Sequence, residues 1–204
     1  MKTFRSARDV LAEVRKALAE TRLYPGDGLP LERATRALHT GRNYLSTQIF
    51  LLRGDTLVRQ CFAGAGEPCA LVPLGKGLVG TAARSGKASV VQDVAADPVF
   101  VRCFAETKSE LVVPIAIGRR VLGVINIDSE RLNAFGATDR VLVKNVAAEV
   151  ARFLTRRGKY VMRKLRESQP RAEQLPARHE PQSEREAAGL VSERRAAAGE
   201  SGRS

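Results

Sequence analysis

Apolar residues recur at helical spacing near both ends of the chain. In residues 4–23 they are three or four positions apart, which predicts an amphipathic helix with the stripe Phe4, Ala7, Val10, Leu11, Val14, Ala17 and Leu18. The segment YPGDGLP then ends this helix, and residues 31–38 predict a second, short one. A long helix is expected over residues 138–164, where the apolar positions include Val141, Leu142, Val146, Val150 and Phe153.

Strand-like runs lie between these helices. Two pairs of runs are separated by short turns that contain Gly54 and Gly118, which is typical of β-hairpins. A further helix is expected at 78–85, where Gly86 ends it. The predicted strands are residues 47–52, 56–62, 71–74, 88–91, 111–117 and 120–128.

The order of these elements indicates the fold class. A helix, two strands, a helix, a strand, a loop, two strands and a final helix predict an α+β fold, with an antiparallel sheet and helices segregated to its faces. Paired hairpins exclude a parallel nucleotide-binding sheet, and no P-loop or dinucleotide-binding glycine motif occurs.

The length of 204 residues suits one domain with appendages. We assign residues 1–24 to the N-terminal helix of that domain, residues 25–155 to its core and residues 156–166 to a basic helical extension. From residue 167 onward the sequence contains almost no large apolar residues. Because that composition buries too little apolar surface to offset the entropy of ordering, residues 167–204 are predicted to be disordered.

The formal net charge of +12 raises the question of an acidic partner. Residues 152–166 (RFLTRRGKYVMRKLR) contain seven cations and no acid. Such a segment could contact nucleic-acid phosphates or an acidic protein, as a scaffold would. Because no nucleic-acid-binding motif accompanies it, we favour a solvated helix end that runs into a basic tail.

Neither a membrane span nor a signal peptide is expected, because no apolar run is long enough and the first residues carry scattered charges. We therefore expect a cytoplasmic protein that does not contact a membrane. In that compartment Cys61, Cys69 and Cys103 would be reduced thiols, and a bond between any two would be transient and functional. The histidines, His39 and His179, offer no metal-ligand spacing and no catalytic triad, so no metal is expected.

The stretch VRCFAETKSELVVP (101–114) contains the residues with the clearest chemical potential. Cys103 follows Arg102, and a neighbouring cation favours the reactive thiolate form of a cysteine. Packing is the alternative for Cys103, because a free cysteine also serves as a small apolar side chain. Glu110 opens a predicted strand and is expected either to line a pocket or to accept hydrogen bonds from loop N–H groups.

Four segments, in order and in register, resemble the GAF domain family: PLGKGLVGTAARSGKASVVQDVAADPVF, TKSELVVPI, VLGVINIDSE and AFGATDRVLVKNVAAEVA. The resemblance covers roughly residues 8–155. It implies a central antiparallel sheet of five to six strands, with the terminal helices on one face and pocket-forming loops on the other. It also implies a small-molecule ligand, a role in signal transduction and a homodimer formed through the terminal helices.

Within that family, the cysteine positions are similar to those of free methionine-(R)-sulfoxide reductases. Cys69 matches the first cysteine of their pattern and Cys103 the third, catalytic one, while Val79 replaces the second. The resemblance implies that Cys103 attacks the sulfoxide and that Cys69 resolves the resulting sulfenic acid. Thioredoxin would then be the reductant and no cofactor would be bound. Mild oxidation is expected to join Cys69 to Cys103, whereas Cys61 is predicted to be a core residue.

The same resemblance implies the candidate ligand-binding residues. Glu110 matches a glutamate that contacts substrate, and Asn126 and Asp128 stand where the reductases have two aspartates. Asp93 is a further candidate, on the loop expected to close over the pocket. As alternatives, Asp128 would cap a turn, and Asp93 and Asp97 would shape their loop, with Asp97 as a helix N-cap.

Two functions follow from these observations. The leading interpretation is a stand-alone GAF domain protein that binds a small molecule or senses redox state. The alternative is an enzyme, a thiol-dependent reductase of free methionine-(R)-sulfoxide. Val79, Asn126 and the absence of tryptophan favour the sensor.

Overall fold

The computed structural model describes residues 5–19, 29–66, 69–101 and 103–156. The predicted helical residues 157–164 and the predicted disordered tail lie outside these residues. The helices are α1 (Ala7–Ala19), α2 (Pro30–Arg42), α3 (Gly77–Ser85) and α4 (Ala137–Arg156), with a short 3₁₀ helix, η1 (Val94–Ala96). The strands are β1 (Ser46–Arg53), β2 (Thr56–Gly64), β3 (Leu71–Pro73), β4 (Ser89–Val91), β5 (Ser109–Ile117) and β6 (Arg120–Ser129).

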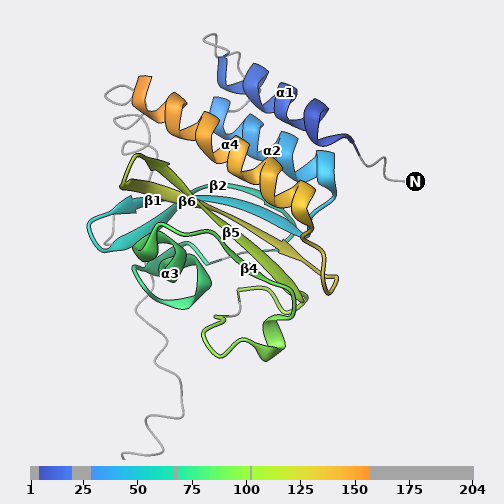
Figure 1. The fold of residues 1–204 in the computed structure, drawn as a ribbon, viewed down its shortest axis with the longest axis vertical. Helices are drawn as coiled ribbons and strands as arrows, with labels where there is room; N and C mark the ends of the chain where they lie inside the picture. Colours follow the sequence, from blue (N-terminus) through green and yellow to red (C-terminus); the bar gives the residue numbers. More distant parts are fainter. Residues whose placement is uncertain (1–4, 20–28, 67–68, 102, 157–204) are drawn as a thin grey trace, which may run out of the picture. The chain divides into compact units, whose positions relative to one another are not determined.

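The six strands form one sheet in the order β3-β2-β1-β6-β5-β4, and every neighbouring pair is antiparallel. This confirms the predicted α+β fold with its central antiparallel sheet (Figure 1). The predicted hairpins correspond to β1–β2 and β5–β6. Within the described residues, no helix is both long and apolar enough to span a membrane.

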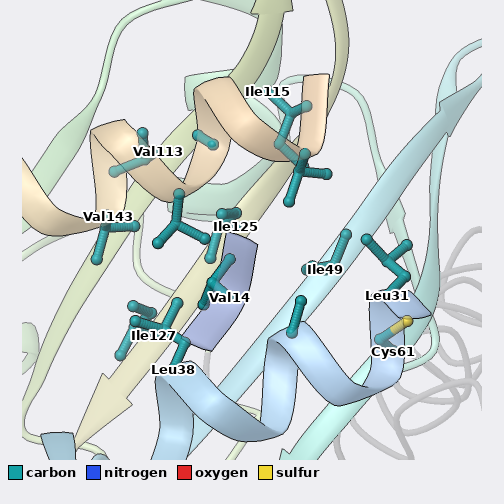
Figure 2. Packing of buried hydrophobic residues seen from close by; sticks show 14 of the residues in the cluster. Val14, Leu31, Leu38, Ile49, Cys61, Val113, Ile115, Ile125, Ile127 and Val143 are labelled. Atoms are coloured by element: carbon teal, nitrogen blue, oxygen red, sulfur yellow. The ribbon is translucent and has the colours of Figure 1, made fainter. Parts of the chain in front are cut away.

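The sheet separates two interiors. On one face, α2 and α4 pack on the sheet and α1 packs on both of them (Figure 1). Residues such as Ile49, Val113 and Ile125 project into this larger core (Figure 2). Cys61 belongs to it and is buried, which confirms the prediction for this cysteine.

The opposite face is covered by α3 and by the loops around it. Phe50, Val112 and Val124 project to this side and pack with the apolar side of α3. Gly80 lets α3 approach the turn after β3, because a Cβ at that position would lie only 2.4 Å from the carbonyl oxygen of Pro73. This close approach places the N-terminus of α3 beside the polar part of the sheet.

A buried ionic network joins the end of α2 to the start of α4. Asp139 Oδ1 accepts hydrogen bonds from Arg42 Nη2 at 2.7 Å and from Tyr44 Oη at 2.9 Å. Burial raises the pKa of the Tyr44 hydroxyl, and the Asp139 charge raises it further, so Tyr44 acts as a donor. Tyr44 also contacts Phe135, with ring centroids 5.9 Å apart. The network therefore fixes α4 on the sheet face where the larger core lies.

This network predicts a large loss of stability in one variant. Asp139→Ala should lower the free energy of unfolding by about 3–5 kcal/mol, because it removes the carboxylate that compensates the buried Arg42 guanidinium. Urea denaturation followed by circular dichroism measures the change. Glu130→Ala, at an exposed acid, serves as the control and should stay within about 0.5 kcal/mol of wild type. Equal effects of the two substitutions would contradict the prediction.

Candidate functional site

A row of polar side chains crosses the otherwise apolar α3 face of the sheet. It consists of Ser46 and Gln48 on β1, Asn126 and Asp128 on β6, and Glu110 on β5. Across the strands, Ser46 pairs with Asp128, Gln48 with Asn126, and Glu110 with Asp128. Because paired residues on antiparallel strands point to the same face, the register alone brings these five side chains together. All five are buried.

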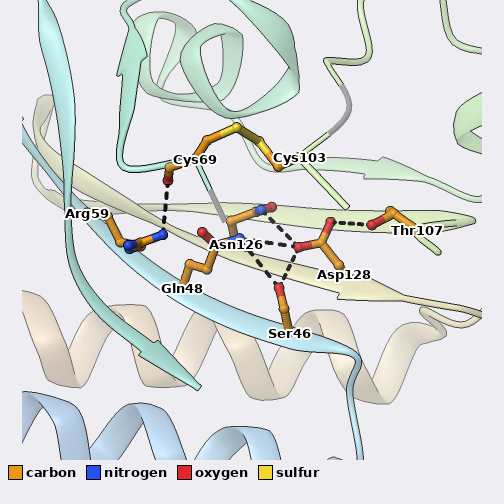
Figure 3. Close-up of a disulfide and its surroundings, with 8 residues drawn as sticks. All are labelled: Ser46, Gln48, Arg59, Cys69, Cys103, Thr107, Asn126 and Asp128. Carbon is orange, nitrogen blue, oxygen red and sulfur yellow. Dashed lines mark hydrogen bonds between the residues drawn. A yellow bond between two sulfur atoms is a disulfide. The ribbon is translucent and has the colours of Figure 1, made fainter. Parts of the chain in front are cut away.

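Asp128 is the centre of the hydrogen bonds in this row (Figure 3). Its Oδ2 accepts from Ser46 Oγ at 2.6 Å, from Asn126 Nδ2 at 3.3 Å and from Gln48 Nε2 at 3.4 Å. Its Oδ1 accepts from Thr107 Oγ1 at 3.3 Å. Four donors therefore surround this carboxylate.

The alternative role of Asp128 as a turn cap is wrong. The following turn is capped by the Ser129 hydroxyl, which accepts a hydrogen bond from the Arg131 N–H at 3.2 Å. Asp128 and Ser129 are successive strand residues and so point to opposite faces of the sheet. Asp128 therefore serves the α3 face and not the turn.

Glu110 and Asp128 form a buried pair of acids. Burial raises the pKa of Glu110 well above its usual range, and the charges of Asp128 and Asp97 raise it further, while a hydrogen bond from Asn126 lowers it. Burial also raises the pKa of Asp128, against the lowering effect of its hydroxyl and amide donors. Two adjacent carboxyl groups resist ionising together, and the hydrogen bonds that Asp128 accepts favour its charged form, so Glu110 is the acid favoured to keep its proton.

A disulfide joins Cys69 to Cys103 over this polar row (Figure 3). The two Cα atoms are 5.6 Å apart, although the residues are 34 positions apart in the sequence. Both cysteines are half-buried, whereas Cys61 is a free thiol in the larger core, on the other side of the sheet. The predicted pairing of Cys69 with Cys103 is confirmed. Their catalytic roles stay predictions.

Contacts with β2 hold both cysteine segments in place. Arg59 Nη1 donates to the carbonyl oxygen of Cys69 at 3.4 Å, and its guanidinium lies 5.6 Å from the ring centroid of Phe62. The Phe62 ring in turn stacks on Phe104, with centroids 6.2 Å apart. Phe104 directly follows Cys103, so β2 positions one cysteine through a hydrogen bond and the other through an aromatic contact.

The disulfide and four residues of the polar row, Gln48, Glu110, Asn126 and Asp128, line one small cavity of about 90 Å³. Its apolar lining includes Phe50, Leu78 and Val79, and Lys76 contributes a cation. Lys76 is also the N-cap residue of α3, and its side chain makes no capping hydrogen bond. The first residues of this helix line the cavity, so the positive end of the helix dipole lies at the cavity wall. The cavity thus combines two sulfur atoms, an acid pair, an apolar wall and a positive end.

Asp93 lies outside this arrangement. It is exposed, and its carboxylate accepts a hydrogen bond from the Ala95 N–H at 3.0 Å, as the N-cap of η1. The prediction that Asp97 is a helix N-cap is wrong, because Asp97 follows η1 and accepts from the Val99 N–H at 2.9 Å. Asp97 nevertheless acts on the site through its charge on Glu110.

Three site residues were not predicted from the sequence: Ser46, Gln48 and Thr107. The available signal was Gln48, a large polar residue inside the apolar strand TQIFLL. Such a residue inside a buried strand needs a polar partner, and Asn126 is its cross-strand neighbour. Among the described residues, no group of three or more histidine, cysteine or acidic side chains could hold a metal ion.

The raised pKa of Glu110 predicts a pH-dependent stability. The unfolded chain releases this proton near the ordinary value of 4.5, whereas the folded protein keeps it to higher pH. The folded state therefore binds more protons in this window, and its stability falls as the pH rises. Glu110→Gln removes the decline, so from about pH 5 to about pH 8 the variant should gain about 1 kcal/mol or more relative to wild type.

Urea denaturation across this pH range, with the disulfide kept oxidised, measures the difference. Glu130→Gln is the matched control, because it makes the same chemical change at an exposed position and should follow the wild-type profile. A Glu110→Gln profile parallel to wild type would contradict the prediction.

The disulfide gives a second prediction. Alkylation of the oxidised protein under native conditions, followed by peptide mass spectrometry, should recover a Cys69–Cys103 pair and an unmodified Cys61. Cys61 should react only after denaturation, because it is buried in the larger core. Reduction should lower the free energy of unfolding by about 2–4 kcal/mol, since it releases a long loop. A disulfide that includes Cys61 would refute this arrangement.

Comparisons with known proteins agree with this geometry. A sequence model of the GAF domain matches residues 31–155, which is more than half of the chain. A free methionine-R-sulfoxide reductase of Escherichia coli is 30% identical over 105 residues, which are 52% of this chain and 63% of that protein. One of Saccharomyces cerevisiae is 37% identical over 94 residues, 46% of this chain and 52% of that protein.

Each of these matches spans less than two thirds of the relative's own length. Among solved structures, a free methionine-R-sulfoxide reductase of Neisseria meningitidis, in complex with its substrate, superimposes with a TM-score of 0.69 at 25% identity. That alignment covers 78% of this chain and 99% of the other. From the fold, the motifs and the matched family model, the chain belongs to the GAF domain family.

Proposed function

We propose that this protein reduces free methionine-(R)-sulfoxide, with Cys103 as the nucleophile and Cys69 as the resolving thiol. The observation that carries the proposal is the Cys69–Cys103 disulfide, which lines the same cavity as the buried pair Glu110 and Asp128. Relatives named free methionine-R-sulfoxide reductase support it, because they include two sequence matches and a structure with similar fold.

The chemistry requires two thiols and one proton donor. The Cys103 thiolate attacks the sulfoxide sulfur, and the sulfoxide oxygen takes up a proton. The new sulfur–sulfur bond and the substrate sulfur–oxygen bond then break as the hydroxyl group passes to the Cys103 sulfur, which becomes a sulfenic acid. Two electrons have then passed to the substrate, which leaves as a thioether. The Cys69 thiol attacks the sulfenic sulfur, water departs, and the disulfide forms.

Glu110 suits the role of the proton donor. It is the buried acid whose pKa is raised well above its usual range, and this favours the protonated form that can donate. Transfer of that proton to the sulfoxide oxygen avoids a free oxyanion as the sulfur–oxygen bond breaks. On the opposite side, Lys76 and the N-terminus of α3 offer a positive end for a substrate carboxylate.

Turnover also needs a reductant for the disulfide, because each cycle leaves Cys69 and Cys103 oxidised. An external dithiol such as thioredoxin supplies two electrons by thiol–disulfide exchange and itself becomes a disulfide. Both sulfur-bearing residues are only half-buried, which leaves the bond accessible to such a partner. No bound cofactor is needed for any step.

A redox-sensing GAF domain is the second candidate. Val79 occupies the position of the second reductase cysteine and is a buried residue of α3, so one thiol pair serves the cavity. In a sensor, the same disulfide would report oxidation by fixing the segment around Cys103 to the segment that precedes β3. Homodimer formation through α1 and α4 stays a prediction under either function.

A thioredoxin-coupled assay with NADPH and free methionine-(R)-sulfoxide tests the proposal. Wild type should oxidise NADPH in proportion to the sulfoxide consumed, and Cys103→Ser should reduce the rate to background. Cys69→Ser should convert about one sulfoxide per chain and then stop, because its sulfenic acid has no internal partner. A dimedone adduct on Cys103, found by mass spectrometry, identifies that stalled state.

Cys61→Ala is the matched control, because Cys61 lies in the core on the other side of the sheet, and it should keep the wild-type rate. The separate step in which thioredoxin reduces the disulfide is measured without sulfoxide. If that step proceeds and no sulfoxide is consumed, the enzyme proposal fails and the redox sensor replaces it.

A further inference from the structure

The cavity contains two buried acceptor atoms that the proposed chemistry does not use. Gln48 and Asn126 both line it and are 1% and 4% exposed. Within the described residues, the side-chain oxygens Gln48 Oε1 and Asn126 Oδ1 have no hydrogen-bond donor. A buried polar atom of this kind destabilises a fold unless a partner arrives, which marks the two oxygens as candidates for ligand contact.

The orientation of both amides follows from Asp128. An ionised carboxylate only accepts hydrogen bonds, so each neighbouring amide must present its NH₂ group and not its oxygen. Gln48 Nε2 and Asn126 Nδ2 both donate to Asp128 Oδ2, at 3.4 Å and 3.3 Å. Reversing either amide would place an oxygen against the carboxylate, so the arrangement fixes the oxygens away from it.

Asp128 is therefore largely occupied by its own neighbours. Ser46 Oγ, at 2.6 Å, makes the shortest of its contacts, and Thr107 occupies the other carboxylate oxygen. A hydrogen-bond donor of a ligand that reaches this part of the cavity would meet two acceptors without a donor, the amide oxygens of Gln48 and Asn126. The two residues that carry these oxygens are cross-strand partners on β1 and β6.

We propose that Gln48 and Asn126 bind the amino group of the substrate through these oxygens, and that Asp128 is the positioning residue that orients them. The inference rests on the proposed function and specifies its substrate class: a small sulfoxide that carries a primary amine. An ammonium group offers three donors, which suits two acceptors from neighbouring strands beside a negative charge, whereas an acylated nitrogen offers one.

The pattern also explains how the site functions with Asn126 where the resemblance implies an acid. A second aspartate at this position would place a third buried acid beside Glu110 and Asp128 and add to the buried negative charge. The amide supplies an acceptor oxygen without that charge, and it contributes a hydrogen bond to Glu110 as well. Gln48 then provides the second acceptor from the neighbouring strand.

Binding to the full chain carrying Cys69→Ser and Cys103→Ser tests the proposal by isothermal titration calorimetry, without turnover. Three probes are compared: methionine-(R)-sulfoxide, its analogue with hydrogen in place of the amino group, and its analogue with hydrogen in place of the carboxylate. Gln48→Met should weaken binding of the two amine-bearing probes about 10- to 100-fold, the value of a hydrogen bond to a charged group. It should change binding of the analogue without the amine less than about 3-fold.

Two further variants separate an acceptor role from a structural one. Asn126→Leu should act like Gln48→Met, whereas Asn126→Asp keeps an acceptor oxygen and should retain most of the affinity. Gln60→Met is the matched control, because Gln60 is a half-buried β2 residue outside the cavity lining and should leave all three affinities unchanged. In the active protein, Gln48→Met should raise KM and leave kcat nearly constant.

Each result decides between the two proposals. If Gln48→Met weakens all three probes equally, or if the analogue without the amine binds as tightly as the sulfoxide itself, the amide inference is overturned while the reductase proposal stands. If none of the probes binds and the wild-type chain consumes no sulfoxide, the proposed function fails and the inference fails with it.

Discussion

The antiparallel register of β1, β6 and β5 is the constraint on which both interiors of this domain depend. Successive residues of a strand point to opposite faces, so Ile127 enters the helix-covered core while its neighbours Asn126 and Asp128 enter the site. A slip of one residue would exchange these sets and bury two polar side chains among aliphatic ones. The site is therefore held in place by the apolar packing on the other side of the sheet.

This arrangement explains how the domain tolerates a destabilising row of polar residues. Two adjacent acids and two amides are buried, and such groups are costly unless they are hydrogen-bonded or neutral. Four donors form hydrogen bonds to Asp128, and the raised pKa of Glu110 favours its neutral form. Within this row, the amide oxygens of Gln48 and Asn126 are the atoms without a hydrogen-bond donor, and both residues line the cavity.

Local sequence patterns predicted the fold well, because each element has its own periodicity. The stripe through Val10 and Val14 and the turn at Gly54 are signals that a few neighbouring residues carry. The polar row has no such local signal. Ser46 and Thr107 acquire their roles only through contact with Asp128, which is 82 and 21 residues away in the sequence. Register across strands decides those contacts, and no single segment encodes it.

The choice of helix cap between Asp93 and Asp97 also could not be predicted from local sequence. Asp97 is a residue type that often serves as a helix N-cap, and it precedes Pro98. The 3₁₀ turn nevertheless begins after Asp93. The choice between two equivalent caps depends on how the loop meets the sheet, where the Val94 N–H donates to the Lys108 carbonyl oxygen. The pairing of Cys69 with Cys103 was likewise implied by resemblance and not by local pattern, because 34 residues separate them.

The replacement of a cysteine by Val79 has a further consequence for any redox cycle in this cavity. With a valine there, the cavity contains no additional thiol to pass the disulfide outward, so an external reductant must attack Cys69 or Cys103 itself. Attack requires an in-line approach to a sulfur atom, and both cysteines are half-buried. Leu71 and Val101 also line the cavity and are 42% and 57% exposed, which gives the partner an apolar surface next to the bond. Substrate and reductant would then approach the same two sulfur atoms through one cavity and could not bind together, so the two half-reactions must alternate.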